Sequence, residues 1–190
     1  MFGAALMMWA CGNGSGVTMT AEEMSLINDS PEVMRILTID SEDDVAVLRS
    51  SSTDFSIPDL SSTEYARLVR KMVRTLEETD GGVGLAAPQI GLSRRVVAVQ
   101  RVDKEGEPVE VYANIAIDRT SGEMVPGPEG CLSVPDRRGD VPRYQQIVIR
   151  YMDVSGDEPR EVHESVSGFA AVIFQHEVDH LDGVLYIDRL

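Results

Sequence analysis

Gln175-His176-Glu177-Val178-Asp179-His180, close to the end of the chain, is the stretch that decides the fold and the chemistry. On an α-helix, side chains four positions apart project from the same face, so His176 and His180 can reach one metal ion while Glu177 lies beside it. The chain has only 3 histidines, and this stretch contains two of them. Two unrelated core histidines are the alternative, but this concentration around an acid favours a metal site.

The residues around this stretch predict the helix itself. Positions i, i+4, i+7 and i+11 share one helical face, and here they hold Phe169, Ile173, His176 and His180. A glycine precedes the run at 168 and another follows it at 183. We therefore expect the ligand pair to face inward. The remaining histidine, His163, lies in an alternating segment and is expected on the surface of a strand.

A catalytic metal site usually has a third protein ligand. Downstream, Asp182 and Asp188 are the candidates, but Asp182 is too close along the helix to reach the metal easily. Upstream, the stretch Glu129-Gly130-Cys131-Leu132-Ser133 offers a thiolate, which is a strong ligand for a borderline metal, next to a glycine that permits close backbone approach. Cys131 is the candidate third ligand, and a small buried apolar cysteine is the ordinary alternative.

A third segment, Gly82-Val83-Gly84-Leu85-Ala86-Ala87-Pro88-Gln89, combines small residues with one terminal amide. No lysine follows it to bind phosphate, so it is read as a close-packed backbone wall that bears one polar side chain. Together, the three segments resemble the GxGxAAxQ, EGCLS and QHExDH motifs of the peptide deformylase family, in this order and spacing. The resemblance runs from about residue 35 to Leu190.

The resemblance implies hydrolysis of the N-formyl group from the formylmethionine that begins a nascent polypeptide, with release of formate. Cys131, His176 and His180 would hold the ion, with a water or hydroxide as the fourth ligand. The resemblance implies ferrous iron (Fe2+) as the metal, and Zn2+, Ni2+ or Co2+ would fit the same ligands. Such a site hydrolyses a linear amide.

The resemblance also assigns roles to residues that do not bind the metal. Glu177 would act as general base toward the water and then as general acid toward the leaving amine. The side-chain amide of Gln89 and the backbone N–H of Leu132 would stabilise the negative charge that develops on the formyl oxygen. Gly84 would line the substrate backbone, and a role in local packing is its alternative.

The remaining sequence predicts an α+β fold. A capping box at Ser61-Ser62-Thr63-Glu64 opens a helix that ends near Gly81-Gly82. Strand-like segments follow, separated by turn signals at 104–106 and 155–157, and they cover Val96-Val102, Val109-Ile117, Gln145-Met152 and Arg160-Val166. Because strands are grouped between helices without regular βαβ alternation, we expect antiparallel β-sheets packed around a central metal-binding α-helix.

Length and charge limit the organisation and the partners. The 190 residues, 43% of them hydrophobic, suit a single catalytic domain, which we expect at 31–190. Residues 1–30 are expected to be an N-terminal tail that is either disordered or the result of a misassigned start. The net charge of −15 argues against direct binding of nucleic acid. We expect a cytoplasmic monomer, since its substrates emerge from the ribosome. The C-terminal extension of many bacterial members is missing, so any ribosome association would not depend on it.

Three further alternatives concern the localisation and the activity. Met1 to Ala10 is almost wholly apolar and precedes Cys11, so export or a lipid anchor at Cys11 is the alternative localisation, although no Lys or Arg precedes Arg35. A zincin-type endopeptidase would share the helix motif without needing Cys131 or Gln89. An inactive homologue would be expected to have lost Glu177 or Gln89, and both are present.

Overall fold

The computed structural model describes residues 16–190, so the expectations for residues 1–15, including the anchor at Cys11, lie outside it. The elements follow one another in the order α1 (Ala21–Asp29), α2 (Glu42–Leu48), α3 (Ile57–Leu60), α4 (Thr63–Glu77), β1 (Gly84–Ala86), η1 (Ala87–Ile90), β2 (Val96–Gln100), β3 (Val109–Cys131), β4 (Val134–Asp153), β5 (Arg160–Ser167), α5 (Gly168–Leu181) and η2 (Tyr186–Arg189). None of the helices in this part of the chain has the length and apolar character that a membrane crossing requires.

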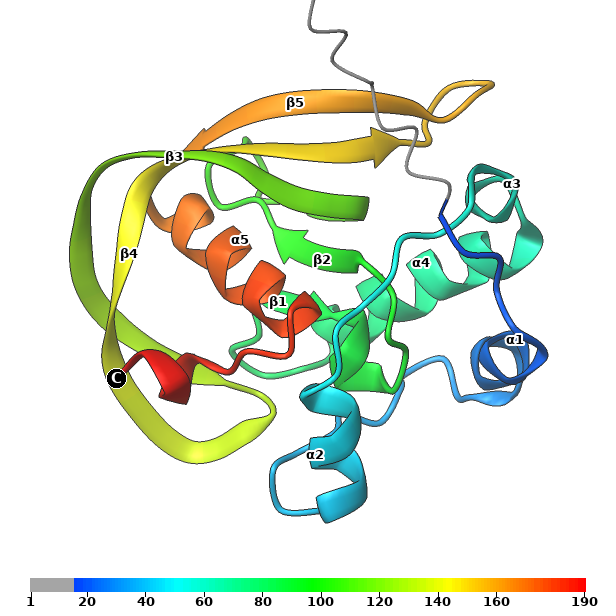
Figure 1. Ribbon diagram of the computed structural model, residues 1–190, viewed down its shortest axis with the longest axis horizontal. Coiled ribbons are helices and arrows are strands. Elements are labelled where there is room, and N and C mark those ends of the chain that lie inside the picture. Colours follow the sequence, from blue (N-terminus) through cyan, green and yellow to red (C-terminus); the bar gives the residue numbers. More distant parts are fainter. Residues whose placement is uncertain (1–15) are drawn as a thin grey trace, which may run out of the picture.

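The strands form one antiparallel sheet of 5 strands in the order β1-β2-β3-β4-β5. The α+β class with antiparallel strands is therefore confirmed, but a single sheet replaces the several that the sequence suggested. β3 and β4 are much longer than predicted, with 23 and 20 residues. Register shifts interrupt their pairing at four places, which bends a ladder, and the pair curves around α5 in Figure 1.

Alternation along β1 and β2 separates two hydrophobic layers. Val96 and Ala98 pack with Leu85 against α1 and α4, whereas Val97 and Val99 pack against α5. Figure 1 shows α4 and α5 on opposite sides of β2. Each large aliphatic side chain that is fully buried in these layers contributes about 1.5–3 kcal/mol to folding. The sheet thus brings the first motif face to face with the histidine helix.

The predicted helix before the first motif is present as α4. Its N-cap is Ser62, whose side chain accepts a hydrogen bond from the N–H of Tyr65. The predicted capping box between Ser61 and Glu64 is wrong, because Ser61 is the C-cap of α3. The helix ends at Glu77, and the following turn leads to β1 through Gly81, which has a left-handed φ of 70°.

Residues 16–30 belong to the folded domain, so the predicted tail at 1–30 is wrong for this part of the chain. Helix α1 buries Ile27 completely. The buried ammonium group of Lys71 donates to the carbonyl of Ile27 at 2.7 Å. Apolar burial and a buried cation therefore dock this segment, although its sequence shows only a weak helical pattern.

Candidate metal centre and active site

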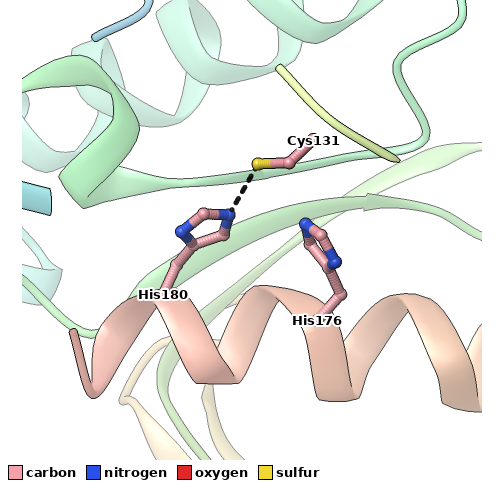
Figure 2. A group of neighbouring side chains, drawn as sticks. All are labelled: Cys131, His176 and His180. Carbon is pink, nitrogen blue, oxygen red and sulfur yellow. Dashed lines mark hydrogen bonds between the residues drawn. The ribbon is translucent and has the colours of Figure 1, made fainter. Parts of the chain in front are cut away.

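Helix α5 carries both histidines on the face that the sequence predicted. Figure 2 shows the rings of His176 and His180 rising from the helix toward Cys131. His180 is almost completely buried, whereas Phe169 in the first turn has 57% of its surface exposed. Phe169 begins the same helical face but is exposed, because the first turn of α5 lines a cavity. His163 lies exposed on β5, as expected.

The structure brings together the three predicted ligands from two distant parts of the chain. Cys131 ends β3, directly before the tight turn at Leu132 and Ser133 that starts β4. Ligand atoms of Cys131, His176 and His180 all lie within 4.8 Å of one another. The Sγ of Cys131 is 3.2 Å from Nε2 of His180 (Figure 2). One ion at ordinary bond lengths of about 2.0–2.3 Å can contact all three atoms.

The chemistry of this donor set fits a borderline divalent metal. One sulfur and two imidazole nitrogens suit iron, zinc, nickel or cobalt. Burial lowers the pKa of His180, so that its ring is neutral, as a ligand must be. Burial opposes protonation of His176 too, but its hydrogen bonds with Cys131 and Glu129 outweigh this effect and raise its pKa to about 10. Binding of a cation to that ring would therefore release its proton.

A buried network orients the His176 ring. The Oε2 of Glu129 lies 2.8 Å from Nδ1 of His176, which leaves Nε2 directed at the ligand cluster. Arg143 donates to both oxygens of Glu129, at 2.7 and 3.0 Å, and to Asp179 at 2.6 Å. Burial raises the pKa of Glu129, but the hydrogen bonds from His176 and Arg143 outweigh it and lower this pKa to about 2.

Sequence reasoning missed this network. Glu129 stood inside a quoted motif, and its position two residues before the thiolate was the available signal for a supporting role. Asp179 likewise lies inside the histidine motif, whereas Arg143 gave no such signal, and only the folded chain shows that the two are buried and paired.

Glu177 is buried beside the ligands, as expected for a helix residue next to His176. Its Oε2 is buried and has no hydrogen-bond partner among residues 16–190. Burial, more than any nearby charge, raises the pKa of this carboxyl to about 7. A Cβ atom built on Gly84 would lie 2.2 Å from its Oε1, so only glycine at this position leaves the carboxylate its place.

The amide of Gln89 is fixed in orientation on the opposite wall. Its Oε1 accepts the N–H of Ala86 at 2.8 Å, and its Nε2 donates to the Oγ of Ser133 at 3.2 Å. The same Nε2 lies 3.7 Å from the Sγ of Cys131, so its other hydrogen points at the ligand cluster. Leu132 follows Cys131 in the turn and lines the cavity.

A cavity of about 760 Å³ opens onto these groups. Five of the predicted site residues besides Leu132 line it, namely Gly84, Gln89, Cys131, His176 and Glu177. His180 lies behind them. Apolar side chains of Val83, Phe169 and Ile173 form part of the wall, and Arg137 and Arg138 are at its polar side. The cavity therefore combines a candidate metal centre, an acid and a donor amide with room for an extended ligand.

Comparisons with known proteins agree with this arrangement. A sequence model described as polypeptide deformylase matches residues 33–190. The chain is 40% identical over 151 residues to the peptide deformylase of Leptospira biflexa, which covers 76% of this chain and 82% of that protein. It superposes on the Thermotoga maritima peptide deformylase with a TM-score of 0.71 and 32% identity, over 83% of this chain and 97% of that one.

A third relative is the class I type b peptide deformylase from Acinetobacter baumannii, whose crystal structure is bound to Met-Ala-Ser. It has a TM-score of 0.71 and 35% sequence identity, and the match covers 83% of this chain and 98% of that one. The family match covers most of the chain, including all three motif segments. The chain therefore belongs to the polypeptide deformylase family.

Proposed function

We propose that Cys131, His176 and His180 hold the catalytic metal ion of this enzyme, and that Glu177, Gln89 and Leu132 carry out the chemistry around it. Enzymes of this family remove the N-formyl group from the formylmethionine of nascent polypeptides and release formate, and this chain is such a deformylase. The observation that carries the assignment of residues is the meeting of three ligand atoms within 4.8 Å beside a buried acid.

The family is metal-dependent, and we assign Fe2+ to this chain as its native metal, with Zn2+, Ni2+ or Co2+ as substitutes. When bound, a divalent ion supplies Lewis-acid activation of a water and of the formyl carbonyl. The neutral, buried His180 and the ring of His176, held by Glu129, present their nitrogens without rearrangement. The thiolate of Cys131 completes a set that these four metals accept.

Glu177 is the proton carrier in this proposal. Its buried Oε2, for which residues 16–190 provide no hydrogen-bond partner, takes a proton from the attacking water, and the carboxyl then delivers that proton to the nitrogen of the leaving amine. A pKa near 7 suits both directions, because the group gains and loses a proton readily at neutral pH. The absence of a side chain at Gly84 leaves room for this carboxylate beside the strand wall.

Gln89 and Leu132 stabilise the negative charge that develops on the formyl oxygen. The Nε2 of Gln89 is aimed at the cluster by its bonds to Ala86 and Ser133, so it need not reorient during the reaction. The backbone N–H of Leu132 is the second donor. Removing one such donor typically raises the barrier by about 2.7–4 kcal/mol.

In this proposal, the substrate lies in the cavity with its formyl group at the metal site. Gly84 lines the peptide backbone, and the apolar wall at Val83, Phe169 and Ile173 receives the methionine side chain. The related enzyme bound to Met-Ala-Ser supports a ligand of this class.

The nature of the substrate also guides the proposed setting of the enzyme. We place it in the cytoplasm as a monomer that meets formylmethionyl chains at the ribosome. With a net charge of −15, electrostatic attraction to nucleic acid does not contribute to that encounter.

Formate release from formyl-Met-Ala by anaerobically purified protein, together with metal analysis, tests this proposal. Cys131→Ser should lose metal and activity together, whereas Glu177→Gln should keep the metal and lose turnover. An endopeptidase would be indifferent to the first change and would cleave internal peptide bonds. Full turnover by Glu177→Gln would remove the proposed proton carrier.

A further inference from the structure

An ordered segment precedes the part of the chain that matches the family. The family match begins at residue 33, yet the structure contains α1 at Ala21–Asp29. The Thr20 side chain and Glu23 form a capping box at the start of this helix. None of the site residues comes from this segment, so the proposed function gives it no role.

Arg94 ties the start of this segment to the turn that follows η1. Its guanidinium donates to both carboxylate oxygens of Glu23, at 2.6 and 2.7 Å, and to the carbonyl of Thr18 at 3.0 Å. Only 2% of Arg94 is exposed. A buried guanidinium needs these partners, because removal of one leaves a charge without compensation in the interior. The position of α1 and the path of the chain at Arg94 are therefore coupled.

The middle of α1 lies next to Gly91, the residue that ends η1. The Cδ2 atom of Leu26 lies 3.6 Å from the position that a Cβ on Gly91 would occupy. Gly91 has a left-handed φ of 90°, and its N–H donates to the carbonyl of Pro88 at 3.1 Å, which closes the η1 turn. Ile27 belongs to the same buried cluster as Ala87 and Ile90 of η1.

The element that α1 supports is the one that carries Gln89. On the other side of η1, the N–H of Leu37 donates to the Gln89 carbonyl at 2.7 Å. The backbone of Gln89 is thus held directly by Leu37, while α1 packs with the residues on either side of Gln89 and with the turn that follows them. Its amide, in turn, points at the ligand cluster.

We infer that α1 is a positioning element for Gln89: Glu23 and Leu26 hold the turn at Gly91 and Arg94 that follows η1, and so keep one amide N–H of Gln89 directed at the developing oxyanion. This inference rests on the role proposed for Gln89. An oxyanion donor acts in the transition state, so its misplacement lowers kcat with little effect on KM. If α1 had a purely structural role, substitutions in it would instead lower the thermal midpoint and the folded fraction.

The test compares Glu23→Gln and Leu26→Ala with Glu22→Gln, an exposed neighbour that undergoes the same loss of charge. For each full-length variant, kcat, KM, metal content and the thermal midpoint are measured with formyl-Met-Ala. We expect kcat to fall about tenfold in the first two variants, with KM and metal content unchanged. A 1 Å misplacement costs about 10²-fold, and the amide should move less than that because it keeps its bonds to Ala86 and Ser133. Glu22→Gln should behave like the parent enzyme. Leu26→Ala keeps the test possible if loss of the Glu23 charge unfolds the protein.

A double-mutant cycle with Gln89→Ala separates positioning from stability. If α1 acts through Gln89, then Glu23→Gln should lower kcat in the parent and cause no further loss in the Gln89→Ala background. The same loss in both backgrounds would overturn the inference while leaving the proposed function intact. A parent-like kcat in Gln89→Ala alone would instead refute the proposed oxyanion role, and with it the role of α1.

Discussion

Gly84→Ala offers the sharpest test of the geometry around Glu177. Real Cβ atoms essentially never approach another heavy atom within 3.0 Å, yet a Cβ at this position would lie 2.2 Å from Oε1 and 2.7 Å from Cδ of Glu177. Strand β1 is held by its pairing with β2, so we expect the carboxylate to retreat by about 1 Å. A misplacement of that size lowers the rate about 10²-fold, which corresponds to about 2.7 kcal/mol of activation free energy.

Steady-state kinetics of formate release, together with a crystal structure of the variant, test whether the Glu177 carboxylate is displaced. A displaced proton carrier lowers kcat, whereas a methyl group that only meets the substrate raises KM. Gly127→Ala is the matched control, because a Cβ there has no heavy atom within 4 Å. A Gly84→Ala enzyme with the parent kcat would refute the argument that glycine is required to place Glu177.

Three other outcomes follow from the site. Glu129→Gln should weaken metal affinity by about 10- to 100-fold, because it removes the charged partner of His176. A competition titration with a chelator measures this affinity, and an unchanged value would contradict the prediction. The pKa of Glu129 is about 2 in the folded protein, below its ordinary value of 4.5, so its contribution to stability is present above pH 4.5 and is lost as the pH falls toward 2. Denaturant unfolding of the metal-free protein across this range should therefore depend less on pH in Glu129→Gln, and equal slopes would exclude the linkage. The iron form should lose activity in air faster than the nickel form, because a thiolate on ferrous iron is prone to oxidation, and equal decay would contradict this reasoning.

The sequence predicted the elements whose signals are local. The histidine helix and α4 have the expected periodicity, and both occur close to their predicted bounds. The candidate ligands came from residue chemistry combined with motif order, and the folded chain brings them together.

The long strands β3 and β4 could not be predicted in full from local signals. Their middle parts are exposed and contain prolines and glycines such as Pro126 and Gly127, which ordinarily indicate loops. Pairing between the two strands, with Pro126 opposite Pro142, extends the ladder through this region. Such cross-strand partners are distant in the sequence, so neither alternation nor propensity reveals them.

The docking of α1 was missed for a similar reason. The position of α1 depends on the buried cations of Arg94 and Lys71, which are distant in the sequence. In the sequence alone, both look like ordinary surface residues. Charged residues are rarely buried, so composition gives no warning of such contacts.

The positions of the ligands along the chain have a mechanical consequence. Cys131 is at the tip of the β3–β4 hairpin and His180 is on α5, 49 residues later. An ion bound to both would fasten the hairpin tip to the helix much as a covalent cross-link closes a loop, and at a free concentration 1,000 times its Kd it would add about 4.1 kcal/mol to the free energy of unfolding. Proteolysis of the metal-depleted enzyme should therefore begin at this tip.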